Sequence, residues 1–121
     1  MKKSIDFYAL LCYHSKVLNF NEVTGKMNIL ENEGYKLLVK AILSLETEEE
    51  CNALLDDLMT KKELLDITQR MLVAKLLSED TVYVKIVEET GASTATISRV
   101  NRSYLYGAGG YSNVLEKIKE D

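Results

Sequence analysis

The chain has 121 residues, enough for one modest domain and too few for two ordinary ones. Hydrophobic residues make up 46% and charged residues 28%, as in soluble globular proteins, and no apolar run approaches the length of a membrane span. Taken alone, the net charge of −4 argues against nucleic-acid binding, while the absence of proline favours an all-helical chain.

The first predicted element is a helix that Ser4 caps and that runs to about Leu18. The following stretch, Asn19–Lys26, is polar and typical of a linker. We therefore expect residues 1–26 to be an N-terminal helical extension and residues 27–121 to be the main domain. Two interpretations of the extension stay open, an added packing helix or a segment that precedes a translation start at Met27.

The next predicted helix, residues 33–45, is apolar almost all round. Its only polar side chains after Glu33 lie on one narrow stripe, Lys36, Lys40 and Ser44. Such a helix must be buried on nearly every side, and a monomer of this size can hardly surround it. A second subunit would do so; the alternative is a monomer in which the N-terminal helix covers these faces.

Two capping boxes then predict two further helices. Thr47–Glu50 starts a helix to about Met59, and Thr60–Glu63 starts one to about Ser78 that is also apolar on more than one face. At about 25 cal/mol per Å² of apolar surface, half-exposed helices of this kind would cost several kcal/mol. The sequence therefore predicts an obligate dimer with an interlocked helical core.

A helix-turn-helix is predicted from Val82 to Tyr104. Gly91 supplies a left-handed turn, Ser93 caps the second helix, and Ile86, Ile97 and Val100 point inward. No acid occurs from Thr90 to Leu115. The predicted DNA-binding residues are the cap and the outward side of the second helix: Ser93, Thr94, Ala95, Thr96, Ser98, Arg99 and Arg102. An ordinary helical turn with solvent-facing arginines is the alternative.

After this motif, Gly107–Gly110 breaks the chain and a last helix, Tyr111–Glu120, carries Val114, Leu115 and Ile118 on one side. We expect it to pack on the core of its own or the partner subunit. The expected fold is thus all-α, with six to seven helices per subunit and an intertwined homodimer. No nucleophile–base pair or phosphate-binding glycine loop is present, so we do not expect an enzyme.

Cysteine and histidine are scarce. Cys12, Cys51 and His14 are the only ones, and none has the spacing of zinc ligands. Unpaired thiols suit a reducing compartment, and Asp6 interrupts any resemblance of the start to a signal peptide. We expect a cytoplasmic protein with no metal, no cofactor and no membrane partner.

Four segments carry a resemblance that covers some two thirds of the chain: residues 41–51, 69–77, 88–102 and 106–111. With them the chain resembles the Trp repressor family, in particular its branch of uncharacterised Trp-repressor-like proteins of Gram-positive bacteria. The resemblance implies a six-helix subunit in an intertwined dimer that binds double-stranded DNA. The first thirty-odd residues lie outside it.

The family's prototype binds tryptophan between its core and its DNA-reading helices. By resemblance, the positions of such an effector pocket are Thr60, Arg70, Arg99 and Ser103. However, Val100 stands where the family has a glycine directly after the recognition-helix arginine, and its isopropyl group would fill the space of the indole ring. The segment between Arg70 and Gly91 is also one residue shorter. We therefore expect that tryptophan does not bind.

These inferences predict a sequence-specific DNA-binding regulator of transcription, most simply a repressor, that binds a two-fold symmetric operator through the major groove. Two alternatives remain. One is a repressor that depends on a small amino-acid-like effector. The other is a helical protein-interaction module with a vestigial helix-turn-helix, which the acidic net charge and the presence of only two arginines on the reading face favour.

Overall fold

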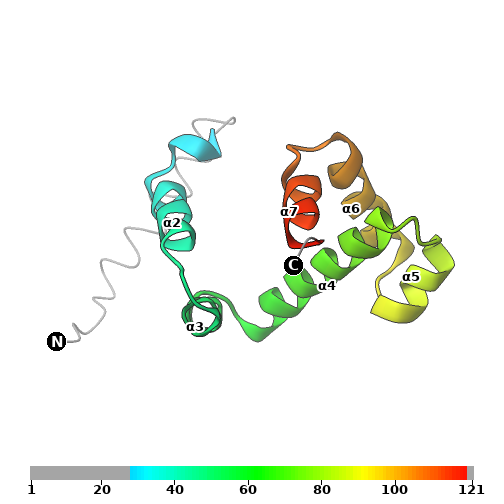
Figure 1. Ribbon diagram of the computed structural model, residues 1–121, viewed down its shortest axis with the longest axis horizontal. Coiled ribbons are helices and arrows are strands. Elements are labelled where there is room, and N and C mark those ends of the chain that lie inside the picture. Colours follow the sequence, from blue (N-terminus) through cyan, green and yellow to red (C-terminus); the bar gives the residue numbers. More distant parts are fainter. Residues whose placement is uncertain (1–27, 120–121) are drawn as a thin grey trace, which may run out of the picture. The chain divides into compact units, whose positions relative to one another are not determined.

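The computed structural model describes residues 28–119, and these are helical with no strand (Figure 1). The predicted N-terminal helix and linker, residues 4–26, lie outside the described residues, as does the predicted domain boundary. The described elements are a 3-10 turn η1 (Ile29–Glu31) and six α-helices: α2 (Glu33–Leu43), α3 (Glu48–Leu58), α4 (Lys61–Ser78), α5 (Tyr83–Thr90), α6 (Thr94–Tyr106) and α7 (Gly110–Lys119). The all-α prediction is confirmed.

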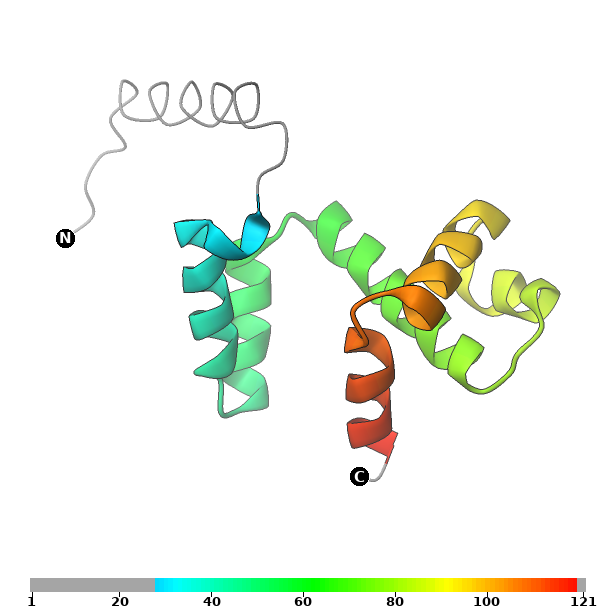
Figure 2. The same cartoon turned by 90° about the horizontal axis from the view of Figure 1, so that it is seen from above.

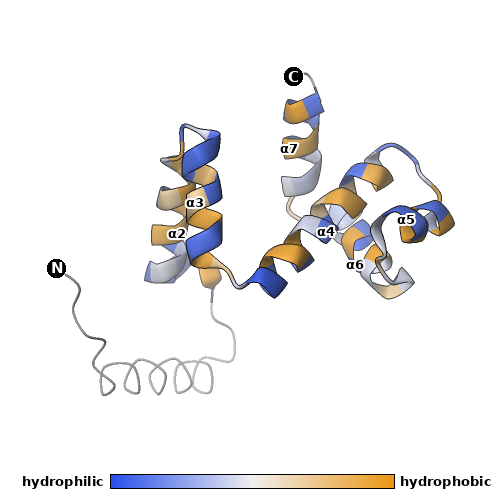
Figure 3. Cartoon of the chain, turned by 90° about the horizontal axis from the view of Figure 1, so that it is seen from below, coloured by the Kyte–Doolittle hydropathy of each residue, from blue (hydrophilic) through white to orange (hydrophobic). Residues whose placement is uncertain are grey.

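The described residues divide into two compact units, and the division falls between Thr47 and Glu48. In the first unit, η1 contacts α2, and Asn32 caps α2 by accepting a hydrogen bond from the Tyr35 N–H at 2.9 Å. The helix ends at Leu43 with Ser44 as its C-cap, two residues before the predicted end. Hydrophobic residues recur along α2 (Figure 3), yet none of its side chains is buried.

In the second unit, the long helix α4 is the element on which α5, α6 and α7 all pack. Figures 1 and 2 both show α6 lying alongside α4. Three of these helices contact one another in turn, since α5 packs on α6 and α6 packs on α7. One cluster of buried side chains joins them: Val73, Ala74, Leu76, Ile86, Ala92, Ile97, Val100 and Leu115.

The predicted capping box at the start of α4 is confirmed. The Glu63 N–H donates to Thr60 Oγ1 at 3.2 Å, and the Thr60 N–H donates to Glu63 Oε1 at 3.0 Å. The Thr60 backbone N–H and then its side chain hold the pKa of the Glu63 carboxyl below its ordinary value. This reciprocal pair satisfies two helix-start N–H groups that would otherwise lack partners.

The last helix differs slightly from the sequence prediction. α7 begins at Gly110, so the break in the chain comprises only Gly107–Gly109. A Cβ at Gly107 would overlap the Ser103 carbonyl, which accepts the Gly107 N–H at 2.9 Å, so only glycine fits this close approach. Within the chain Leu115 packs into the core, whereas Val114 and Ile118 on the same helix remain exposed.

Candidate nucleic-acid interface

The turn between α5 and α6 has the geometry that the sequence predicts. Gly91 adopts φ +71°, in the left-handed region, and its N–H donates to the Val87 carbonyl at 2.9 Å. Ser93 then caps α6, because its hydroxyl oxygen accepts the Thr96 N–H at 3.1 Å. The helices begin and end near the predicted positions, although α6 continues two residues further, to Tyr106.

Buried side chains fix α6 on one side. Ile97 is fully buried and Val100 is 3% exposed, and both belong to the core cluster that also includes Ile86. The half-buried Val87 and Tyr104 pack against the same cluster. Val87 is bulkier than the small residue usual where two such helices cross. The structure accommodates it, because the Val87 side chain packs against the core cluster.

The other side of α6 is exposed. Ser93, Thr94, Ala95, Ser98, Arg99 and Arg102 are all solvent-accessible, while Thr96 is half-buried. Thr96 differs from the rest in a second way, since its hydroxyl oxygen accepts a hydrogen bond from Ser93 Oγ at 3.0 Å. The Thr96 hydroxyl is thus part of the helix cap, and it is less available to an external partner than those of Thr94 and Ser98.

The charges on this face are unpaired. The three ion pairs among residues 28–119 all use lysines: Lys36–Glu33, Lys62–Asp66 and Lys75–Glu79. Neither Arg99 nor Arg102 takes part in one, and no acid lies between Thr90 and Leu115. Two free guanidinium groups on an acid-free helix are available to an external anion such as a phosphate.

The predicted effector positions are only partly brought together. A cavity of about 150 Å³ is lined by Arg70, Arg99, Val100, Ser103 and Tyr111. It includes three of the four predicted residues and the valine predicted to obstruct an indole ring. Thr60 does not line this cavity; its side chain caps α4 instead. The sequence analysis did not single out Tyr111 as a pocket residue. Its position in the cavity depends on how α7 packs on α4 and α6, and no local sequence pattern indicates that packing.

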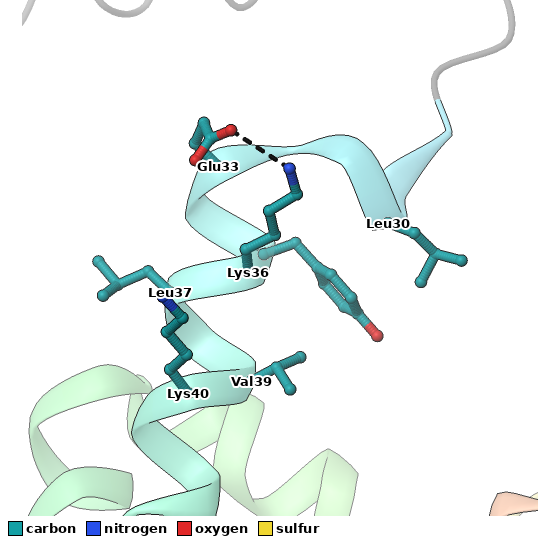
Figure 4. A pocket seen from close by; sticks show the side chains of 7 residues that line it. Leu30, Glu33, Lys36, Leu37, Val39 and Lys40 are labelled. Atoms are coloured by element: carbon teal, nitrogen blue, oxygen red, sulfur yellow. Dashed lines mark hydrogen bonds and ion pairs between the residues drawn. The ribbon is translucent and has the colours of Figure 1, made fainter.

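Two larger hollows are present, and the second adjoins this cavity, since Ser103 and Tyr111 line both. One of about 670 Å³ runs along η1 and α2 and is lined largely by apolar side chains and lysine stems (Figure 4): Leu30, Glu33, Tyr35, Lys36, Leu37, Val39 and Lys40. Another of about 430 Å³ lies where α4, α6 and α7 meet, beside Met71 and Val114. Within residues 28–119 no group of acidic, histidine or cysteine side chains is arranged to hold a metal. In the same range no helix has the length and apolarity needed to cross a membrane.

Comparison with known proteins matches this arrangement to one family. The family model of the Trp repressor protein matches residues 33–119. The uncharacterised protein YerC of Bacillus subtilis is 49% identical over 83 residues, which cover 69% of this chain and 80% of that protein. The crystal structure of a TrpR-like protein from Eubacterium eligens superposes with a TM-score of 0.73 at 46% identity, covering 77% of this chain and 96% of that one. A second crystal structure, from Staphylococcus aureus, superposes with a TM-score of 0.72 at 41% identity, covering 79% of this chain and 98% of that one.

Proposed function

This chain belongs to the Trp repressor family, whose members are dimeric DNA-binding regulators rather than enzymes, and we propose that it is a sequence-specific regulator of transcription, most simply a repressor. The observation that carries the proposal is the exposed side of α6. Two unpaired arginines and a row of small hydroxyl and methyl side chains stand on a helix whose opposite side is locked into the core. This is the construction of a recognition helix.

Each part of this surface has a role in the proposed complex. The N–H groups of Thr94 and Ala95 precede the first intrahelical bond of α6 and are free to bind a phosphate. Thr94, Ala95, Thr96 and Ser98 are small enough for close approach to base edges, and the methyl groups of the two threonines and Ala95 suit the thymine methyl. Arg99 and Arg102 would bind phosphates or guanine. Specificity thus comes mainly from the first turns of α6, and affinity from the arginines.

The apolar side chains that the described part of the chain leaves exposed support the proposal of a homodimer. Neither α2 nor α3 has a buried residue, although an 11-residue helix is marginal in water without packing. Exposed leucine, isoleucine and valine side chains also occur on α4 and α7: Leu65, Ile67, Leu72, Val114 and Ile118. Such exposed apolar side chains favour association, because a stable monomer leaves few large apolar patches in water. A second copy would cover it and present two α6 helices about 34 Å apart, one DNA turn.

We expect Arg102→Ala to weaken binding to an enriched genomic fragment about tenfold at moderate salt, because each dimer loses two cations. If Arg102 of each subunit contacts a phosphate, the loss of these two contacts should make the slope of log affinity against log salt shallower by about two. Mobility shifts at several salt concentrations measure both quantities. The matched control is Lys117→Ala, which removes the same charge from the exposed side of α7 and should leave binding unchanged. Equal affinities for the parent and Arg102→Ala would remove Arg102 from the interface.

The regulator is proposed to act without tryptophan. Val100 is a residue of α6, is 3% exposed, and lines the cavity of about 150 Å³ beside Arg70 and Arg99. Its isopropyl group reduces the room that an indole ring would need beside the two arginines. Moving Val100 aside would force neighbouring core residues out of place, at a cost of about 1–3 kcal/mol.

Calorimetric titration of the protein with tryptophan is therefore expected to give no binding in the micromolar range. Titration with smaller amino acids serves as the comparison, since Arg70, Arg99 and Ser103 do converge on one cavity and would suit a small carboxylate. Micromolar binding of tryptophan would overturn the role given to Val100. Micromolar binding of a smaller amino acid would support the effector-dependent alternative.

One observation favours a protein-interaction module instead. Val82 and Val84, at the start of α5, are 68% and 71% exposed, and exposed apolar side chains suit a protein partner better than a phosphate backbone. Recovery of a protein partner from host extract, without enrichment of any DNA fragment at low salt, would support this alternative against the regulator.

A further inference from the structure

A single side-chain hydrogen bond connects α4 to the helix-turn-helix in the described part of the chain. Gln69 Nε2 of α4 donates to the Thr90 carbonyl oxygen at the end of α5, at 3.2 Å. The two residues are 21 positions apart, and the bond is partly buried. The contacts between α4 and the motif within the core cluster are all apolar.

The bond meets the motif at its turn. The Thr90 hydroxyl donates to the Ile86 carbonyl at 2.7 Å and accepts the Ala92 N–H at 3.1 Å. Ala92 is buried, and the next residue is Ser93, the cap of α6. A displacement of Thr90 is therefore passed through Ala92 to the first turn of α6, where Thr94 and Ala95 are exposed.

Apolar packing and a hydrogen bond constrain this junction differently. Contacts among Val73, Ala74, Ile97 and Val100 hold α6 against α4, but apolar contacts are non-directional and do not by themselves distinguish between closely similar orientations of the motif. A hydrogen bond weakens steeply with angle and with distance. The Thr90 carbonyl also lies at a helix C-terminus, where carbonyls lack intrahelical partners, so Gln69 satisfies a group that would otherwise need water.

We propose that Gln69 is a positioning residue for DNA recognition: it selects the one orientation of α5 and α6 on α4 that presents the start of α6 to a major groove. The proposal rests on the DNA-binding function proposed above and specifies how the reading orientation is held within the chain, with no effector. Gln69 itself does not contact DNA.

The test uses the full-length chain and two DNA probes: a fragment enriched by the unmodified protein from sheared host genomic DNA, and a random-sequence duplex of equal length. Gln69→Met keeps the length and the helix propensity of the side chain but removes the donor. We expect its affinity for the enriched fragment to fall about tenfold, with affinity for the random duplex within about twofold. Gln69→Glu, which places a carboxylate against the Thr90 carbonyl, should lose more.

The matched control is Thr68→Ala. Thr68 is the preceding residue of α4, it is exposed, and its hydroxyl donates only to the Leu65 carbonyl of the same helix, at 2.9 Å. This variant also loses one side-chain hydrogen bond, but none to the motif, so its ratio of specific to random affinity should be unchanged. A purely stabilising role for Gln69 would lower the melting temperature without changing that ratio for the folded protein, and this result would overturn the proposal.

A second measurement needs no variant. Proton exchange of the Gln69 side-chain amide, followed by NMR, should be slowed relative to a free glutamine, and fast exchange would overturn the proposal even if the variants fail to fold. Failure of the proposed function looks different, because then no genomic fragment is enriched at all. In that case the inference falls with it. Enrichment with equal ratios for Gln69→Met and the parent removes only the role of Gln69.

Discussion

Replacement of Ile42 by glutamate is expected to abolish the dimer. In the single chain Ile42 is 53% exposed, so a monomer would accept glutamate there without penalty. In the proposed dimer the same position, on the side of α2 opposite its polar stripe, is covered by the partner. The variant then loses about 1.5–3 kcal/mol of apolar burial and must also desolvate a carboxylate, once in each subunit.

Sedimentation and circular dichroism at several protein concentrations measure this effect. The matched control is Lys40→Glu, which introduces the same side chain on the polar stripe of α2 and should leave the dimer intact. Glutamate is a good helix former, so neither change acts through the propensity of α2. A dissociated or unfolded Ile42→Glu protein supports the dimer, whereas an unchanged dimer with an unchanged melting temperature would place Ile42 outside the interface.

The acid-free reading surface and the dimer are connected by the distribution of charge. The net charge of −4 would repel DNA from most of the molecule, and the absence of acids from Thr90 to Leu115 leaves one region where approach is favourable. A dimer doubles that region on one side of the duplex and doubles the number of phosphates neutralised, which is why binding by a single subunit should be far weaker. Loss of the dimer in Ile42→Glu should therefore also abolish DNA binding.

Local signals were sufficient to predict the helix-turn-helix. A glycine at the left-handed position, a serine cap and the spacing of Ile86, Ile97 and Val100 each act within a few residues, and the structure has all of them in place. The capping box of α4 is equally local. By contrast, η1 has only three residues, too few for any hydrophobic period, and its asparagine caps resemble ordinary loop residues.

Long-range features could not be predicted in the same way. The apolar residues of α2 indicate that the helix needs cover, but periodicity does not say which chain supplies it. The bond from Gln69 to Thr90 depends on how α5 packs on α4, and a glutamine in a helix carries no signal of such a partner. The same holds for Tyr111, which joins the cavity beside Arg70 and Arg99 only because α7 folds back onto α4 and α6.

Truncation of Ile97, the fully buried residue of α6, is expected to cost more stability than any surface change. Ile97 is fully buried in a cluster with residues of α4, α5 and α7, so Ile97→Ala removes packing on several sides at once. We expect the free energy of unfolding to fall by about 2–5 kcal/mol, a large share of the roughly 5–15 kcal/mol typical of a native protein. Ile97→Val should cost only about 0.5–1.5 kcal/mol.

Urea denaturation at one fixed protein concentration measures these losses, because the stability of a dimer depends on concentration. Ser98→Ala is the informative control, since Ser98 is the next residue of α6 and is exposed. It should change stability by less than about 0.5 kcal/mol while weakening the specific complex. If Ile97→Ala cost under about 1 kcal/mol, α6 would not be anchored as the structure has it. The opposite responses of two adjacent residues would separate the two sides of this helix, one holding the fold and one reading DNA.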